Sequence, residues 1–181
     1  MEITPLKLPG TYTITLRRFE DPRGYFAETY RESVFAEAGL VTGWVQENQS
    51  LSHQPGTLRG LHFQTPPCAQ TKLVRVLSGT ALDVWVDLRK DSPTFRQWDA
   101  LELSTEAMNM VYVPKGFAHG FLTLTPDVVV SYKIDAYYAP DHDSGLRWDD
   151  PAFGIDWPVD SPHLSEKDAS LPTLAEFPSP F

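Results

Sequence analysis

The chain has a single cysteine, Cys68, among 181 residues, so no disulfide can form within it. Proteins without disulfides are typical of a reducing compartment. The chain also has no run of about 18 apolar residues, the length that a membrane-spanning helix needs. Its first residues lack the basic and apolar regions of a secretory signal peptide. We therefore expect a soluble, cytoplasmic protein that does not bind membranes.

Positive charge is scarce as well. Lys and Arg number 15 against 24 Asp and Glu, which gives a formal net charge of -9. A surface that binds nucleic acid is expected to be basic, so the composition argues against a nucleic-acid partner. A small anionic ligand is still compatible with this charge if a few cationic side chains converge. The length suits one domain with a substantial core, and we expect a single domain over residues 1–181.

Long helical segments are also missing, and short alternating segments dominate the chain. In the clearest one, residues 80–88, every second side chain is Leu or Val, and two aspartates lie between them. Further strands are expected at residues 11–19, 44–50, 57–64, 72–77, 95–103, 109–113, 120–124 and 128–134. Many short strands without helices between them predict an all-β antiparallel sandwich or barrel.

Helices are expected only at the periphery. Residues 31–38 are the one helix candidate before the end of the chain, and residues 165–169 suit a turn of helix against the barrel. Five of the 16 prolines lie at or after Pro158. Because proline cannot donate to a β-ladder, we expect the C-terminal segment to wrap the surface without pairing as strands.

Residues 59–64, Arg-Gly-Leu-His-Phe-Gln, resemble half of the metal-binding motif of cupin barrels. Such a cupin typically has a second histidine two residues after the first, and a glutamate a few residues later. Here Gln64 occupies the first of these places, and no carboxylate occurs between His62 and Asp83. A metal bound by this motif would have one ligand where three or four are needed. We therefore expect no metal, and His62 is free to transfer protons.

A second histidine, His119, follows the turn at residues 114–116, where we expect a strand to start. With His62 it suggests two imidazoles in the mouth of one barrel. A structural role for His119, bonded to the backbone, stays open. Arg59, within the first motif, and Lys72, eight residues after it, add the charge that is typical of a functional site.

Several other segments carry a resemblance to a known family. They are residues 19–28 (FEDPRGYFAE), 45–48 (VQEN), 58–64 (LRGLHFQ), 72–76 (KLVRV), 132–133 (YK), 138–140 (YAP), 148–151 (WDDP) and 164–168 (LSEKD). With these segments in this order, the chain resembles the dTDP-4-dehydrorhamnose 3,5-epimerase family from about Ile14 to Leu171. The resemblance implies a metal-free cupin jelly-roll barrel with short peripheral helices and no redox cofactor. It also implies a homodimer whose N-terminal strands contribute to the partner's sheet.

Members of this family epimerise carbons 3 and 5 of a dTDP-4-keto-6-deoxyhexose, whose ketone acidifies the hydrogens on both neighbouring carbons. The resemblance places the catalytic base at His62, and an imidazole that titrates near neutrality suits this task. Asp168 matches the aspartate that would orient this imidazole. Tyr132 matches the acid on the opposite face of the sugar, and Lys72 suits the stabilisation of the enolate oxygen.

The resemblance also implies a set of substrate-binding residues. Arg23 and Arg59 match positions that contact the nucleotide sugar, and guanidinium groups suit phosphate oxygens. Tyr138 matches the tyrosine that stacks on thymine. The other matching positions are Glu28, Gln46, Asn48, Lys72, His119, Asp143 and Lys167. Asp143 stands where the family frequently has glutamate, and Gln49 where it often has histidine.

Other functions stay open. Relatives in antibiotic-sugar pathways invert only carbon 3 or only carbon 5, and the departures from the family pattern leave the choice undecided. A ketoisomerase is a further alternative, but Tyr132 opposite His62 favours epimerisation, since a ketoisomerase can move its proton on one face. A noncatalytic nucleotide-sugar binding cupin is disfavoured by the complete proton-transfer set. A metal-dependent cupin oxygenase is disfavoured by the missing ligands.

Overall fold

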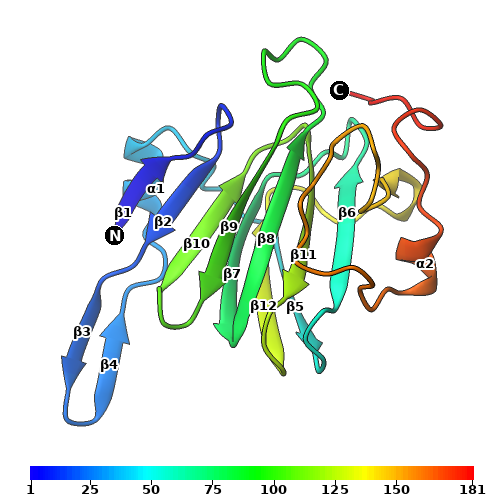
Figure 1. Cartoon of the computed structure of the whole chain (residues 1–181). Coiled ribbons are helices and arrows are strands. Elements are labelled where there is room, and N and C mark those ends of the chain that lie inside the picture. Colours follow the sequence, from blue (N-terminus) through cyan, green and yellow to red (C-terminus); the bar gives the residue numbers. More distant parts are fainter.

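Two antiparallel sheets face each other and form a flattened barrel (Figure 1). The computed structural model describes all 181 residues. The larger sheet has the strand order β1 (Glu2–Pro5), β2 (Tyr12–Thr15), β10 (Asn109–Val113), β7 (Lys72–Ser78), β12 (Val128–Ile134) and β5 (Gln46–Ser52). The smaller sheet has the order β13 (Asp143–Gly145), β6 (Leu58–Gln64), β11 (Phe117–Thr123), β8 (Thr80–Asp87) and β9 (Trp98–Ser104).

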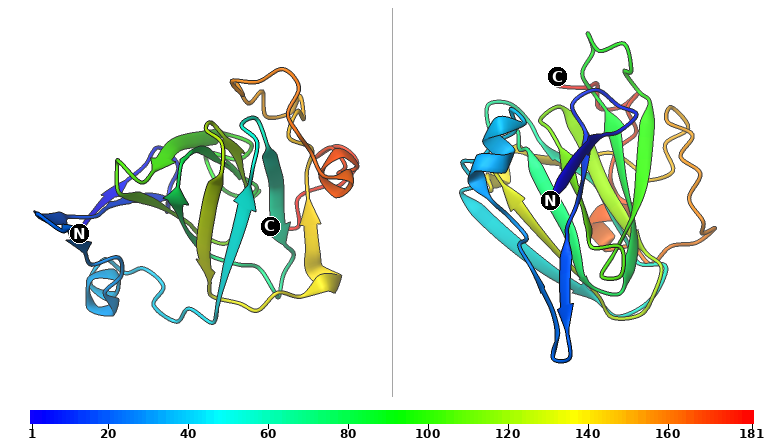
Figure 2. Two further views of the ribbon diagram at one scale, coloured as in Figure 1. Left: turned by 90° about the horizontal axis from the view of Figure 1, so that it is seen from below. Right: turned by 90° about the vertical axis from the view of Figure 1, so that its left-hand side faces the viewer.

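The remaining elements are short and lie outside the barrel. A hairpin of β3 (Arg18–Asp21) and β4 (Gly24–Ala27) projects away from it (Figures 1 and 2), and helix α1 (Glu32–Glu37) follows. Helix α2 (Glu166–Ala169) lies beside β6, on the side of the molecule opposite α1 (Figure 2). A short 3-10 helix, Pro140–His142, precedes β13. The longer α-helix, α1, has only 6 residues, so no helix is long enough to cross a membrane.

Strand alternation divides the apolar side chains into three layers. Inward-facing residues of both sheets form the core inside the barrel, where Trp85 is fully buried. The outer face of the smaller sheet is covered by the C-terminal segment, for example by Trp157 and Leu174. The outer face of the larger sheet packs against α1 through Phe35. Both sheets are therefore buried on two faces over much of their area.

Strand β8 shows what this double burial does to polar residues. Its Leu and Val side chains pack under the C-terminal segment, so its other face points into the barrel. Asp83 and Asp87 are therefore buried, although their alternation with apolar residues is typical of a strand with one face in water. Asp87 is satisfied by Arg89, Ser92 and Thr94. Asp83 has a different partner, which belongs to the functional site.

The chain after Gly145 forms no further strand, and its one β-bridge joins Thr57 to His163. The buried carboxylate of Asp150 anchors this segment by accepting hydrogen bonds from the backbone N–H groups of Ala152 and Leu174. The segment thereby carries α2 to the side of β6.

The predicted all-β fold with short peripheral helices is confirmed, with several local corrections. Residues 11–19, predicted as one strand, form β2 and β3, because the chain leaves the barrel between them to start the hairpin. The strand expected at residues 120–124 begins at Phe117, directly after Gly116 ends the turn with a φ of +91°. His119 therefore lies within β11 and not at its start.

Three short strands, β1, β4 and β13, have no predicted counterpart, because runs of four or fewer residues carry too little alternation. Residues 95–97, predicted as strand, form a turn in which Arg96 has a φ of 68°. The helix predicted at residues 31–38 spans residues 32–37 and ends just ahead of Gly39, whose φ is 70°. The predicted helical turn begins at Glu166, with Ser165 as its cap.

Candidate active site

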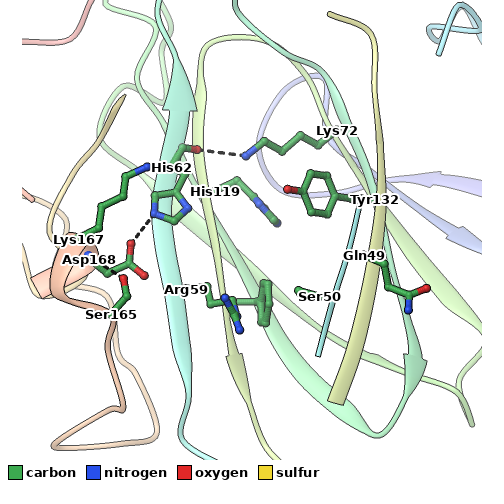
Figure 3. Close-up of a pocket in the computed structure, with 11 residues that line it drawn as sticks. Gln49, Ser50, Arg59, His62, Lys72, His119, Tyr132, Ser165, Lys167 and Asp168 are labelled. Carbon is green, nitrogen blue, oxygen red and sulfur yellow. Dashed lines mark hydrogen bonds and ion pairs between the residues drawn. The ribbon is translucent and has the colours of Figure 1, made fainter. Parts of the chain in front are cut away.

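A cavity of about 310 Å³ opens between the two sheets, beside α2 (Figure 3). It is lined by Gln49, Ser50, Arg59, His62, Lys72, His119, Phe121, Tyr132, Ser165, Lys167 and Asp168. A second cavity of about 270 Å³ shares four of these residues, and its lining includes His62, Lys72, Tyr132, Lys167, Asn48, Tyr138 and Asp143. Most of the lining is polar or charged, which suits a polar, anionic ligand better than an apolar one.

Arg59 and His62 both face the first cavity, although side chains three apart on a regular strand point to opposite faces. The reason is a shift in the pairing of β6 with β11. His62 is opposite His119, whereas Arg59 is opposite Phe121, so β6 contains one more residue than β11 between these pairs. Such a bulge redirects side chains, and here it puts an arginine and a histidine on one wall.

Two glycines allow this bulge. Gly60 has a φ of +130°, and a β-carbon added to it would lie 2.6 Å from the Cα of Gly120. A β-carbon added to Gly120 would in turn lie 2.7 Å from the carbonyl oxygen of Arg59. The close approach of β6 and β11 therefore requires glycine at position 60, and it fixes where His62 points.

His62 is paired with a carboxylate from the C-terminal segment. Its Nε2 lies 2.5 Å from Oδ1 of Asp168 on α2, and Ser165 accepts the Asp168 N–H at 3.0 Å. Burial acts to raise the pKa of Asp168, but its interactions with His62, Ser165 and Lys167 together outweigh burial and lower the pKa. Because an ionised carboxylate can only accept, Nε2 of His62 carries the proton. When the ring is neutral, the lone pair is then on Nδ1, on the cavity side of the ring (Figure 3).

His119 forms a second, deeper pair. Its Nε2 lies 2.8 Å from Oδ1 of Asp83, and the two side chains are 8% and 1% exposed. Burial lowers the pKa of His119 even though Asp83 acts to raise it. His119 is therefore neutral at pH 7 and suits hydrogen bonding to a ligand. The other oxygen of Asp83, Oδ2, has no hydrogen-bond partner.

Lys72 enters the cavity from β7, in the sheet opposite His62. Its Nζ donates to the carbonyl oxygen of His62 at 3.3 Å (Figure 3). Burial lowers its pKa to about 8, while Asp83 and Asp143 act to raise it. At pH 7 most molecules therefore hold a buried ammonium here. A cation in such surroundings stabilises a developing negative charge more strongly than one in water.

Tyr132 reaches the cavity from β12, and Figure 3 shows its hydroxyl directed into the space between the sheets. Burial raises its pKa, a hydrogen bond with Asn48 acts to lower it, and Asp143 adds to the rise. The phenol therefore keeps its proton at neutral pH. The cavity thus has a lone pair on one wall, from His62, and a proton donor on the opposite wall.

Residues at the rim of the second cavity are joined through Asp143. Its Oδ2 accepts from the hydroxyl of Tyr138 at 3.0 Å and from Nζ of Lys167 at 2.5 Å. Tyr138 is 53% exposed, and its ring is thus open to stacking. Gln46 adjoins this group, because its side chain accepts the Tyr138 N–H at 3.0 Å and donates to Asn48 at 2.9 Å.

The structure brings most of the predicted site residues together. Those around the two cavities are Asn48, Arg59, His62, Lys72, His119, Tyr132, Tyr138, Asp143, Lys167 and Asp168. Two predicted residues, Arg23 and Glu28, lie elsewhere in this chain. The side chain of Arg23 is 90% exposed in the projecting hairpin, and Glu28 pairs with Arg31. They do not contribute to the cavities of their own chain, because the hairpin leads away from the barrel.

Sequence reasoning missed some contributors to the site. Ser50 lies two residues after Asn48 on β5 and shares its face, so strand alternation could have identified it. Asp83 had no local signal, because its role depends on the pairing of β8 with β11. The position of a second cupin ligand is held by Gln64, whose amide donates to backbone carbonyls. No group of three or more His, Cys, Asp or Glu side chains is placed to hold a metal ion.

A protein-family model described as dTDP-4-dehydrorhamnose 3,5-epimerase matches residues 5–176. The chain belongs to this family. A curated dTDP-4-dehydrorhamnose 3,5-epimerase from Sinorhizobium fredii is 50% identical over 182 residues, which cover 100% of this chain and 93% of that relative.

Solved structures in this epimerase family share the fold. The crystal structure of dTDP-4-dehydrorhamnose 3,5-epimerase from Bacillus anthracis, with TDP and PPi bound, matches with a TM-score of 0.93 and 49% identity, over 96% of this chain and 99% of that one. ChmJ, a 3'-monoepimerase from Streptomyces bikiniensis in complex with dTDP-quinovose, matches with a TM-score of 0.87 and 36% identity, over 95% and 87%. The predicted family, cupin barrel and isomerase class are therefore confirmed.

Proposed function

We propose that the chain epimerises carbons 3 and 5 of dTDP-4-dehydro-6-deoxyglucose and so forms dTDP-4-dehydrorhamnose. The observation that carries the proposal is a single cavity with a proton acceptor, Nδ1 of His62, and a proton donor, the phenol of Tyr132, on walls from opposite sheets. The relatives from Sinorhizobium fredii and Bacillus anthracis, which bear this enzyme's name, support the same activity.

The first step removes a proton from the carbon next to the ketone. Nδ1 of His62 takes the hydrogen of carbon 3 or 5 as a proton, and the electron pair of the C–H bond moves into the ketone as an enolate. Asp168 favours this step in two ways: it fixes the ring so that Nδ1 faces the sugar, and its charge stabilises the imidazolium that forms.

The enolate oxygen needs a positive charge close to it, and Lys72 supplies one. Its ammonium is buried and already held by the carbonyl oxygen of His62, so little reorganisation is needed when the charge develops. The neutral ring of His119, next to it in the cavity lining, is positioned to hydrogen-bond a sugar oxygen.

Inversion follows when the proton returns from the other face. Tyr132 donates its hydroxyl proton to the carbanionic carbon while His62 still holds the proton that it removed. Water then restores the phenol and takes the proton from the imidazolium, so no atom is gained or lost overall. The raised pKa of Tyr132 keeps the phenol protonated until this step.

The nucleotide is bound at the rim. The exposed ring of Tyr138 suits stacking on thymine, and the cationic side chains of Arg59 and Lys167 suit the diphosphate. The TDP and PPi in the Bacillus anthracis structure support a thymidine diphosphate ligand.

Arg23 and Glu28 fit the proposal if the chain forms a homodimer. Their hairpin projects from the barrel and exposes Phe19, Tyr25 and Phe26, each at least 50% accessible. Exposed aromatic residues on an unsupported hairpin are typical of an interface. In the proposed dimer the hairpin reaches the partner subunit, where Arg23 and Glu28 contact the nucleotide of the partner's cavity.

A second candidate function is inversion of a single carbon. The observation that favours it is the match to ChmJ, a 3'-monoepimerase with the same fold. The proton-transfer residues would act in the same way, and the outcome would depend on which carbon the bound sugar presents to His62.

The decisive test is incubation with dTDP-4-dehydro-6-deoxyglucose in deuterated water, followed by NMR of the sugar. Deuterium at carbons 3 and 5 with the inverted product supports double epimerisation, and deuterium at one carbon supports the monoepimerase. Deuterium at neither carbon contradicts both.

A Tyr132→Phe variant separates removal of the proton from its return in the same assay. His62 can still exchange a proton on its own face, so deuterium should enter with retained configuration while inversion falls by about 100-fold. Unchanged inversion in this variant would rule out Tyr132 as the acid.

A further inference from the structure

Gln64 is a buried polar residue that the reaction does not use. It lies at the end of β6, is 3% exposed, and lines the second cavity near Tyr138. In the cupin motif this position would carry a second histidine ligand. Here every hydrogen bond of its side chain goes to backbone, which indicates that the amide holds a loop in place.

The loop that it holds is the one that carries Tyr138. Nε2 of Gln64 donates to the carbonyl oxygens of Tyr137, at 3.2 Å, and Cys68, at 2.7 Å. Its Oε1 accepts the N–H of Ala139 at 2.7 Å. The residues immediately before and after Tyr138 are therefore both bonded to one side chain. Carbonyls only accept and N–H groups only donate, so these partners also fix which end of the amide is which.

Tyr138 itself has little to hold its ring. The residue is 53% exposed, and its hydroxyl is bonded to an acidic side chain that is itself paired with Lys167. The ring is therefore held at its hydroxyl by this one bond, and its direction is set by its backbone, which is fixed on both sides by Gln64 and at its own N–H by Gln46. A ring that is already oriented loses less conformational freedom when a base stacks on it.

We propose that Gln64 is a positioning residue for nucleobase binding, which acts by clamping the backbone on both sides of Tyr138. The inference rests on the proposed function for the identity of the base, a thymine, but its geometry concerns any planar ring that stacks on Tyr138. Gln64 touches no substrate in this account, and its effect passes entirely through the tyrosine.

The test is a double-mutant cycle between Gln64 and Tyr138, read from KM, kcat and the Kd of dTDP. Gln64→Met keeps the length of the side chain but removes all three hydrogen bonds, and it should raise KM and Kd by about 10-fold while kcat changes less than about 2-fold. Tyr138→Ala should raise them by about 10- to 100-fold, because it removes the stacking face. In the double variant the loss should equal that of Tyr138→Ala alone.

Gln70→Met provides the matched control. Gln70 is also an amide on a neighbouring loop, but its one bond goes to the carbonyl of Ala136, two residues before Tyr138. Its effect on Kd should be below about 3-fold. An equal effect of the two variants, or losses that add in the cycle with Tyr138→Ala, would overturn the proposal, since both would indicate a general structural role.

A Gln64→Glu variant keeps the test decisive if Gln64→Met fails to fold. It retains the acceptor for Ala139 but sets a carboxylate against two carbonyl oxygens. Its Kd for dTDP should be raised at pH 8 and recover toward pH 5, where a protonated carboxyl can donate again. If the Kd of this variant depends on pH no more than the Kd of the wild type does, the proposed clamp is contradicted.

The same measurements distinguish a failure of the proposed function from a failure of this inference. If the wild type binds dTDP without turning over the sugar, the proposed reaction is wrong and the cycle is read from Kd alone. If the wild type does not bind dTDP, both proposals fail.

Discussion

The cavity contains two histidine–aspartate pairs that differ in their surroundings. His62 and His119 face each other across β6 and β11. The pair of His62 with Asp168 joins the barrel to the C-terminal segment, and the His62 side chain is 30% exposed. The pair of His119 with Asp83 lies within the smaller sheet, where the two side chains are 8% and 1% exposed.

In the proposed reaction only His62 is a base, so a carboxylate partner alone does not determine this role. Burial lowers the pKa of His119 and keeps its ring neutral, so it can donate or accept a hydrogen bond but holds a proton poorly. The His62 side chain is 30% exposed and lines the cavity, so its Nδ1 is accessible to a ligand. Solvation, more than pairing, assigns the two roles.

The largest expected effect comes from removing each imidazole in turn. His62→Ala should lower kcat by about 1,000-fold, because the cavity loses its lone pair, and should leave the Kd of dTDP largely unchanged. His119→Ala should act mainly on KM. Steady-state kinetics of both variants tests this, with His53→Ala as a control, since His53 also pairs with an aspartate but is exposed outside the cavity. Equal losses of kcat in the His62 and His119 variants would contradict the different roles proposed for the two histidines.

Replacing the two aspartates should show the same contrast between the pairs, but with smaller effects on kcat. Asp168→Asn should lower kcat by about 100-fold, because an amide can present either its oxygen or its NH2 group and no longer fixes the tautomer of His62. Asp83→Asn should change kcat less than about 10-fold and act mainly on KM, because His119 transfers no proton. A larger kcat effect for Asp83→Asn would assign the base to the deeper pair.

A pH profile tests the lysine that lies beside both imidazoles. The ammonium of Lys72 is needed and its pKa is about 8, so kcat should fall as the pH rises above about 8, approaching about tenfold per pH unit. In Lys72→Arg the charge persists at high pH, so this fall should disappear even if the overall rate is lower. A wild-type rate that stays constant to pH 10 contradicts the role given to the ammonium.

The smallest effect concerns stability. The pKa of His119 is lowered on folding from its ordinary value of 6.5, so below that pH the unfolded chain binds more protons than the folded one. The free energy of unfolding should therefore decrease as the pH falls below about 6.5, by at most about 1.4 kcal/mol per pH unit from this group. Urea unfolding at pH 5.5 and 7.5 measures the change, and His119→Gln should make it smaller. A wild type that is more stable at pH 5.5 would contradict the burial of a neutral ring.

The sequence alone predicted those features that depend only on neighbouring residues. Strands with clear alternation, such as β8, were predicted almost to the residue, because period-two patterns are a property of each strand alone. The motif around His62 was also recognisable, since Gly60, which the bulge needs, and the histidine are only two positions apart in the sequence.

Long-range features could be predicted only through the family resemblance or not at all. Asp168 and His62 are 106 positions apart, and nothing in either segment specifies that α2 lies beside β6. Asp83 was read only as part of an alternating strand, because the inner face of β8, to which it points, is buried by the other sheet. The hairpin with Arg23 could not be placed, because the Arg23 side chain is 90% exposed and pairs with Asp21 of the same hairpin, so the barrel does not specify its position.

The late position of Asp168 along the chain has a consequence for synthesis. All the strands leave the ribosome before α2, so Asp168, the proposed partner of the base, is the last residue of the candidate site to be made. A product that ended ahead of Ser165 would retain Tyr138 and Arg59 but lack both this carboxylate and Lys167. Loss of this stretch would also remove Leu174 from the layer that covers the smaller sheet, so the site and its support depend on the same last residues.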